Sequence, residues 1–294
     1  MIPSIFHYGS PDSLPCCCRI GATRAPDWDP DLAYSPDGVP NDSPLLQGIQ
    51  YWSTGFVIHE NVVATAAHAP RSPLVMGDRV VLPAIESEKG SVLHHQRVLQ
   101  VRRILDHPLA KSAKGFDVRL LILHYDDDHP YAANVRREIV DRTATLTELQ
   151  ASDKEFRIYG FNQDAESSST VPFEGKMRLA RYPGDADRPE RHGHQPGKEF
   201  VLQPVDETRD LAAPSADFGD SGAPITVDRS GREDVVGMYV RRSTNRPVSK
   251  NPDLVVIQLH REIQAWAKTA LARFDISITV PSAVASTASP QAAP

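Results

Sequence analysis

Short runs of apolar residues separated by turn residues begin near position 45, and this pattern predicts β-strands. The runs are rich in Val, Ile and Leu and form two sets, with a polar connector between them at residues 126–150. The first set comprises residues 51–58, 61–69, 78–85, 95–105 and 117–125, and the second comprises 155–161, 176–182, 199–205, 223–228, 234–242 and 254–259.

After the second set the spacing of apolar residues changes to that of a helix. One helical face would carry Leu259, Ile263, Trp266, Ala267, Ala270, Leu271 and Phe274. Two sets of about six strands and a closing helix predict an all-β fold of two packed six-stranded antiparallel β-barrels with a C-terminal α-helix. The expected boundaries are an irregular N-terminal extension at 1–44, barrels at 45–130 and 151–258, a helix at 259–274 and a disordered tail at 276–294.

Composition narrows the class of protein. The 294 residues are 40% hydrophobic and 24% charged, and the net charge is -6 with both signs mixed along the chain. These values indicate a globular protein and no nucleic-acid partner. No run approaches the roughly 18 apolar residues of a transmembrane helix. The N-terminus lacks the basic start and apolar core of a signal peptide, which favours an intracellular location and leaves the compartment open.

All three cysteines are adjacent, at Cys16, Cys17 and Cys18. Neighbouring cysteines cannot join distant parts of a fold, so the globular part is expected to contain no internal disulfide. A flexible tail with exposed thiols is the simplest interpretation, and acylation that anchors the protein to a membrane is the alternative.

The segment FGDSGAPI places Ser221 between glycines. Such a string forms a turn, or it presents a nucleophile whose neighbouring backbone N–H groups bind an oxyanion. In the second case the donors are the N–H groups of Gly219 and Ser221. The α/β-hydrolase motif G-x-S-x-G does not fit, because Ala223 stands two positions after the serine.

Two further residues have the chemistry that a serine nucleophile needs. His68 ends the run VVATAAHA, and Asp117 begins the run DVRLLILHY. Taken singly, each has a structural interpretation: His68 as a satisfied structural histidine, and Asp117 as a turn or strand cap. Together, they supply a base and a carboxylate from the first strand set for Ser221 in the second set. A site between the two barrels follows.

Six segments in this order resemble the chymotrypsin-like (trypsin-fold) serine peptidase family. They are STGFVIHENVVATAAHA, ILDHPLAKSAKGFDVRLLIL, RIYGF, FGDSGAPI, VVGMYV and LHREIQAW, spread over roughly residues 47–272. The resemblance implies a peptidase domain at 45–275 that hydrolyses protein or peptide substrates through an acyl-enzyme, without a cofactor. It assigns catalysis to His68, Asp117 and Ser221, with Gly219 and Ser221 as the oxyanion hole.

The sequence departs from the family pattern at three positions. Ala69 stands where a cysteine usually follows the histidine, Ala223 replaces a glycine after the nucleophile, and Arg119 replaces an alanine in the aspartate strand. The arginine suggests that this strand face is more exposed than usual. Because it lacks the family's disulfides, the sequence is more similar to the bacterial glutamyl-endopeptidase and high-temperature-requirement branches than to digestive trypsins.

The resemblance also places a specificity pocket at Ser215, Val240, Arg241 and Arg242. Ser215 would form the base of the pocket, so the carboxylate that binds Lys or Arg side chains is missing and apolar side chains are accepted. Arg241 and Arg242 would instead favour an acidic side chain, unless they belong to a solvated loop.

Activation by cleavage is suggested by Arg19-Ile20-Gly21, which resembles a family activation site whose new N-terminus pairs with the residue at Asp220. Two histidine pairs, His94-His95 and His192 with His194, lack the carboxylates or thiolates of a zinc site, so no metal is expected. Two alternatives to an active endopeptidase remain: a peptidase-fold binding or scaffold protein, and an esterase that uses the same site. The oligomeric state is left open.

Overall fold

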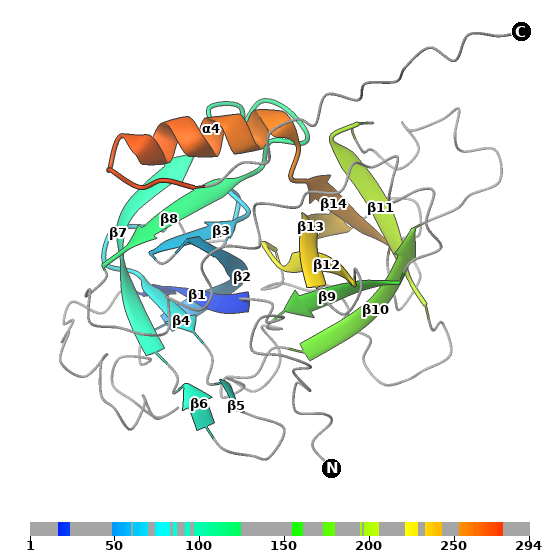
Figure 1. Cartoon of the computed structure of the whole chain (residues 1–294), viewed down its shortest axis with the longest axis horizontal. Helices are drawn as coiled ribbons and strands as arrows, with labels where there is room; N and C mark the ends of the chain where they lie inside the picture. Colours follow the sequence, from blue (N-terminus) through cyan, green and yellow to red (C-terminus); the bar gives the residue numbers. More distant parts are fainter. Residues whose placement is uncertain are drawn as a thin grey trace, which may run out of the picture.

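Two closed six-stranded antiparallel barrels lie side by side, with one helix across the top of the view in Figure 1. This arrangement confirms the all-β, two-barrel prediction. The computed structural model describes residues 17–23, 49–59, 61–69, 74–82, 85–86, 92–94, 97–124, 155–160, 173–179, 195, 197–205, 221–228, 233–242 and 253–278. The connector predicted at 126–150 lies outside these residues.

The first barrel has the strand order β1-β2-β3-β8-β7-β4, and β4 closes it by pairing with β1. Its core-facing positions follow from the apolar runs of the sequence, and all four residues of β3 are buried. The strands are β1 (Cys17–Thr23), β2 (Ile49–His59), β3 (Val62–Thr65), β4 (Arg79–Leu82), β7 (Arg97–Asp106) and β8 (Arg119–Leu123).

The second barrel has the order β10-β11-β14-β13-β12-β9 and is closed by the pairing of β9 with β10. Each predicted run of the second set overlaps one of its strands, although β10 begins three residues before its run. The strands are β9 (Phe156–Gly160), β10 (Phe173–Leu179), β11 (Glu199–Pro204), β12 (Pro224–Asp228), β13 (Glu233–Arg242) and β14 (Leu254–Gln258).

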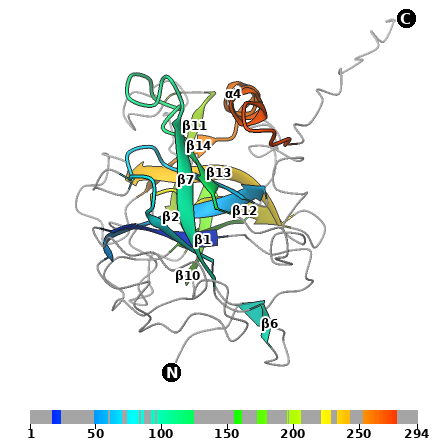
Figure 2. The ribbon, with the colours of Figure 1, turned by 90° about the vertical axis from the view of Figure 1, so that its left-hand side faces the viewer.

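A short hairpin lies apart from both barrels. It pairs β5 (Ile85–Glu86) with β6 (Val92–His94). Figures 1 and 2 both show β6 below the barrels, so the hairpin is an excursion between β4 and β7 of the first barrel. The predicted strand 78–85 therefore divides into β4 and the start of this hairpin.

Strand β1 corrects the prediction that residues 1–44 form an irregular extension. It pairs with β2 over its whole length and with β4 through three residues, so the first barrel begins at Cys17 rather than near 45. Residues 1–16 and 24–48 lie outside the described residues.

The buried cysteines contradict the expected tail with exposed thiols. Cys17 and Cys18 are buried, at 1% and 0% exposure, and the Cys17 thiol donates a hydrogen bond to the Tyr159 carbonyl oxygen, 3.4 Å away on β9. The adjacent Arg19–Ile20 bond is buried between two paired strands. This position argues against an activation cleavage there, because an attacking protease would have to open the barrel.

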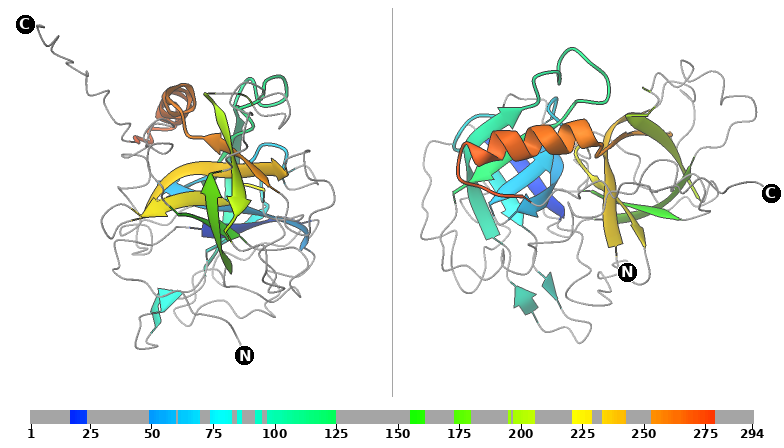
Figure 3. Two further views of the ribbon diagram at one scale, coloured as in Figure 1. Left: turned by 90° about the vertical axis from the view of Figure 1, so that its right-hand side faces the viewer. Right: turned by 45° about the horizontal axis from the view of Figure 1, so that its top comes forward.

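The helix α4 (Arg261–Ala272) returns from the second barrel to cover the first. Figure 3 shows it crossing the strands of the first barrel, and its residues Ile263, Ala267 and Leu271 pack in the core there. Trp266 is partly buried, as predicted, but Phe274 lies beyond the helix and is 40% exposed. The chain after the helix remains ordered, since Ile276 is buried, so the predicted tail begins later than residue 276.

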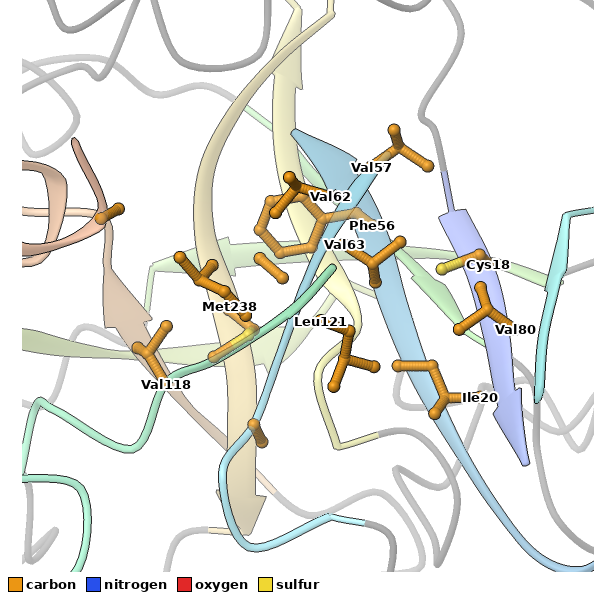
Figure 4. Close-up of a cluster of buried hydrophobic side chains, with 14 of the residues drawn as sticks. Cys18, Ile20, Phe56, Val57, Val62, Val63, Val80, Val118, Leu121 and Met238 are labelled. Carbon is orange, nitrogen blue, oxygen red and sulfur yellow. The ribbon is translucent and has the colours of Figure 1, made fainter. Parts of the chain in front are cut away.

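One hydrophobic core joins the two barrels. Figure 4 shows Met238 of the second barrel beside Val118, Leu121 and Phe56 of the first, and all four belong to one cluster of buried side chains. A separate cluster around Phe156 fills the interior of the second barrel. The shared core fixes how the barrels sit against each other, which is the requirement for a site built from both.

Candidate active site

His68 stands in a turn directly after β3, where the buried strand ends. The turn is closed by a hydrogen bond from the Ala69 N–H to the Ala66 carbonyl oxygen at 3.2 Å. While the preceding strand is buried, the side chain of His68 is 48% exposed. The strand therefore delivers the imidazole to the surface of the molecule.

Asp117 holds the imidazole from the neighbouring strand segment, just before β8. One carboxylate oxygen accepts the backbone N–H of His68 at 3.0 Å, and the other contacts its Nδ1 at 2.5 Å. A carboxylate can only accept, so Nδ1 carries a hydrogen. In the neutral ring, Nε2 is then free to accept a proton.

Ser221 completes the arrangement from the second barrel. Its Oγ lies 2.9 Å from Nε2 of His68. The hydroxyl hydrogen can therefore be donated to Nε2, and the chain of contacts runs from carboxylate to imidazole to hydroxyl. The structure brings together the three residues that the sequence analysis selected, although they come from two barrels.

The turn that carries Ser221 is bonded to both barrels. The Gly222 N–H donates to the Tyr239 carbonyl oxygen at 2.8 Å within the second barrel, and the Thr54 N–H of the first barrel donates to the Ser221 carbonyl oxygen at 3.2 Å. Gly222 has φ +96, and a Cβ there would lie 2.0 Å from the Thr54 carbonyl oxygen. Only glycine fits this approach between the barrels.

Comparison with known proteins decides the family. A family model named Trypsin matches residues 38–266, which is most of the chain. The chain belongs to the trypsin family. The match relates the chain to serine peptidase hydrolases in general. A search of curated proteins gives no match.

Solved structures show the same trypsin fold. The chain is similar to a structure of GrC, with 16% sequence identity and a TM-score of 0.55. The match covers 90% of this chain and 98% of that chain. At this identity the likeness concerns the fold alone.

The predicted specificity residues of this trypsin-family chain are only partly described. Ser215, Gly219 and Asp220 lie outside the described residues, so their roles remain predictions. Val240 is buried, with 1% exposure, and Arg242 is exposed.

Arg241 has a different environment from the one that an acidic substrate would need. Its two terminal nitrogens each donate to Glu199, at 2.8 Å to Oε1 and 2.8 Å to Oε2. Because this guanidinium already binds a carboxylate of the protein, the expectation that Arg241 selects acidic side chains loses its support.

Arg119 also differs from expectation. Its side chain is only 11% exposed, so the strand face is covered rather than open. The guanidinium binds both carboxylate oxygens of Asp106, at 2.5 and 3.1 Å, and donates to the Ala69 carbonyl oxygen at 3.1 Å. Arg119 thereby connects β7 and β8 to the turn that carries His68.

The sequence analysis missed Glu199 entirely. This residue begins β11, and its side chain has no exposed surface. A Glu at the start of an apolar strand gives no signal in the sequence, and its partner Arg241 follows 42 positions later.

Within the described parts of the chain, there is no group of three or more His, Cys, Asp or Glu residues that could hold a metal ion. No helix among these residues is long and apolar enough to span a membrane.

Proposed function

We propose that this protein is a serine endopeptidase that hydrolyses peptide bonds with His68, Asp117 and Ser221. The observation that carries the proposal is the continuous contact from Asp117 through His68 to Ser221, at 2.5 Å and 2.9 Å. The carboxylate, base and nucleophile that this chemistry uses lie within hydrogen-bonding distance at the surface, where a substrate can reach them.

In the first half of the reaction, Oγ of Ser221 attacks the carbonyl carbon while Nε2 of His68 takes the hydroxyl proton. Asp117 orients the ring and stabilises the imidazolium that forms. The negative oxygen of the tetrahedral intermediate is bound by the N–H groups of Gly219 and Ser221. The intermediate collapses to an acyl-enzyme, and the amine leaves with the proton from Nε2.

In the second half, water replaces the amine. Nε2 takes a proton from the water, whose oxygen attacks the acyl carbon, and the acid product leaves when the proton returns to Oγ. All proton transfers use the same ring nitrogen, which agrees with an imidazole whose Nδ1 is committed to Asp117. No cofactor takes part in any step.

Cleavage after uncharged side chains is the preference that this proposal includes. Ser215 offers no charge at the predicted pocket base, and Arg241 is engaged with Glu199. Profiling the purified protein on a peptide library checks this preference, and exclusive cleavage after acidic residues would contradict it.

Two alternatives use the same geometry differently. A scaffold with little turnover would keep the fold without the chemistry, since the fold alone does not guarantee catalysis. An esterase would use the same three residues to cleave an ester, whose acyl bond is broken more easily than that of an amide.

Labelling with a fluorophosphonate tests the proposal. The folded protein is expected to be labelled at Ser221, and Ser221→Ala is expected to lose labelling and to lower peptide hydrolysis by about 10⁴-fold or more, because the nucleophile is gone. Ser112→Ala is the matched control, since this serine is exposed on a first-barrel loop, and it should behave as wild type. A folded wild type without labelling favours the scaffold, and labelling with ester but no peptide hydrolysis favours the esterase.

A further inference from the structure

A buried carboxylate of the second barrel binds the segment of the first barrel that carries Asp117. The side chain of Glu199, at the start of β11, is 0% exposed. Its Oε1 accepts the backbone N–H of Gly115 at 3.1 Å, two residues before Asp117. A direct hydrogen bond thus joins β11 to the backbone leading into the aspartate.

Four donors saturate this carboxylate. Besides Gly115, they are the N–H of Gln195 at 2.7 Å to Oε2 and the two terminal nitrogens of Arg241 at 2.8 Å. Burial of a carboxylate is unfavourable unless its charge is paired and its oxygens are hydrogen-bonded, and both conditions hold here. Glu199 is therefore held by the side chain of Arg241 on β13 and by the backbone N–H of Gln195, which precedes β11.

Gly115 is hydrogen-bonded through both its backbone N–H and its carbonyl oxygen. Its carbonyl oxygen accepts Nε2–H of His260, 3.1 Å away at the start of α4. Its φ is +81, and a Cβ would lie 2.6 Å from Cβ of Lys198. The glycine thus lies in contact with β11, in a conformation that other residues rarely adopt.

The next residue, Phe116, is enclosed by rings and by a cation. It stacks on His107 at 4.7 Å between ring centroids, meets His260 edge to face at 5.2 Å, and lies under the ammonium of Lys198 at 4.0 Å. With 3% exposure, it cannot move without displacing these neighbours. Both residues before Asp117 are thus fixed by groups from the second barrel and the helix.

We propose that Glu199 is a positioning residue that sets the location of Asp117, and through it the orientation of His68, from the second barrel. Ser221 belongs to the second barrel, whereas His68 and Asp117 belong to the first. An anchor that joins Gly115 to β11 therefore keeps the acid and base in register with the nucleophile. This inference deepens the proposed function and rests on it.

The charges around the anchor are balanced locally. Glu199 is paired with Arg241, and Lys198, which lies over Phe116, is paired with Glu262 of α4 at 3.1 Å. Lys198 and Glu262 provide a matched comparison, because Glu262 is 62% exposed and binds Lys198, the residue directly before Glu199. The two glutamates differ in burial and in their contact with Gly115.

Glu199→Gln tests the inference, with Glu262→Gln as the control. The amide removes the charge and replaces one acceptor with a donor that faces donors. We expect kcat to fall about 10- to 100-fold with KM changed little, the loss typical of a small displacement of catalytic groups. The acid limb of the kcat/KM profile should move to lower pH, because a displaced Asp117 stabilises the imidazolium less. The control should match wild type in both measurements.

Proton NMR of the His68 ring gives a readout that does not need catalysis. The Nδ1 hydrogen bonded to Asp117 should give a downfield signal in wild type and in Glu262→Gln, and this signal should weaken or shift in Glu199→Gln. A thermal melt reports whether each variant is folded. If Glu199→Gln does not fold, Arg241→Lys, which keeps the positive charge but not the paired hydrogen bonds, should show the same changes at smaller size.

The outcomes separate the two proposals. If the wild type is not labelled by a fluorophosphonate, the proposed function is contradicted, while the NMR comparison still decides the role of Glu199. A folded Glu199→Gln with wild-type kcat, acid limb and Nδ1 signal overturns the inference, as does a variant that is only less stable. If Glu199→Gln does not fold, wild-type values of kcat, the acid limb and the Nδ1 signal in Arg241→Lys overturn the inference.

Discussion

Gly222 shows how closely the nucleophile turn approaches the first barrel. Besides the Thr54 carbonyl oxygen, a Cβ would meet Oγ1 of Thr65 at 2.4 Å. That hydroxyl donates to the Thr54 carbonyl oxygen at 2.7 Å, so neither atom can move aside without breaking a buried hydrogen bond.

Gly222→Ala is therefore expected to lower both stability and activity. The left-handed backbone alone costs about 1–2 kcal/mol for an alanine, and the clash with Thr54 adds to it. Gly197→Ala isolates the backbone cost, because Gly197 has φ +79 with open space around it. Urea unfolding and kcat/KM measure the difference; equal losses in both variants, with unchanged activity, would contradict the steric argument.

At the residue scale, the sequence predicted His68, Asp117 and Ser221 because each has a local motif. Glu199 has none, and Arg241 was selected only as a predicted pocket residue. Their pairing depends on the neighbouring positions of β11, β14 and β13 in the second barrel. Such a partner becomes visible only when the order of the strands is known.

At the element scale, β1 is the strand that periodicity failed to predict. Its sequence, CCRIGAT, contains small and charged residues without alternation of apolar and polar positions. Nevertheless, Arg19 is buried, and burial lowers its pKa to about 10. Closure of the barrel outweighs local preference here, since β1 is paired on both edges. The other barrel strands overlap runs that the sequence shows plainly.

Ile20→Ala tests the place of β1 in the barrel. Ile20 has 0% exposure in the core of the first barrel, and its truncation is expected to cost about 2–5 kcal/mol of unfolding free energy. Met76→Ala is the control, because Met76 is 64% exposed and should change stability by no more than about 0.5 kcal/mol. Denaturant unfolding compares them, and an Ile20→Ala variant as stable as the control would place β1 outside the core.

At the scale of the whole molecule, the two barrels and the helix meet around His107 and His260. Burial, first of all, lowers the pKa of both imidazoles, and the charge of Lys198 adds to this effect. His107 accepts the Leu109 N–H at Nδ1, an interaction that a protonated ring could not keep. The contact at His107 therefore requires a neutral ring.

Stability is consequently expected to fall as the pH is lowered. A histidine with a lowered pKa in the folded state takes up its proton more readily when unfolded, so its contribution is present above about pH 6.5 and is lost as the pH falls through the lower folded pKa. Burial raises the pKa of Asp253. The contribution of this carboxyl group to stability therefore changes with pH in the opposite direction, and it does so at lower pH than that of the histidines. Melting temperatures between pH 8 and 5 measure the trend, which should flatten in His107→Phe; an equal slope in this variant would exclude His107 as a source.

The two-barrel architecture followed from the count and spacing of apolar runs, whereas the contacts between the barrels did not. Met238, Val118 and Leu121 are ordinary strand residues in the sequence, yet they meet in one core. Such meetings depend on how closed barrels dock, which no local pattern records.

The pairing of β1 has a practical consequence for anyone who shortens this protein. The family match begins at residue 38, so a trimmed chain cut at that boundary would lack β1. The backbone amides and carbonyls of β2 and β4 that β1 now satisfies would be left bare. Unpaired strand edges form hydrogen bonds with the same edges of other molecules, so such a fragment should aggregate and precipitate rather than remain a monomer in solution.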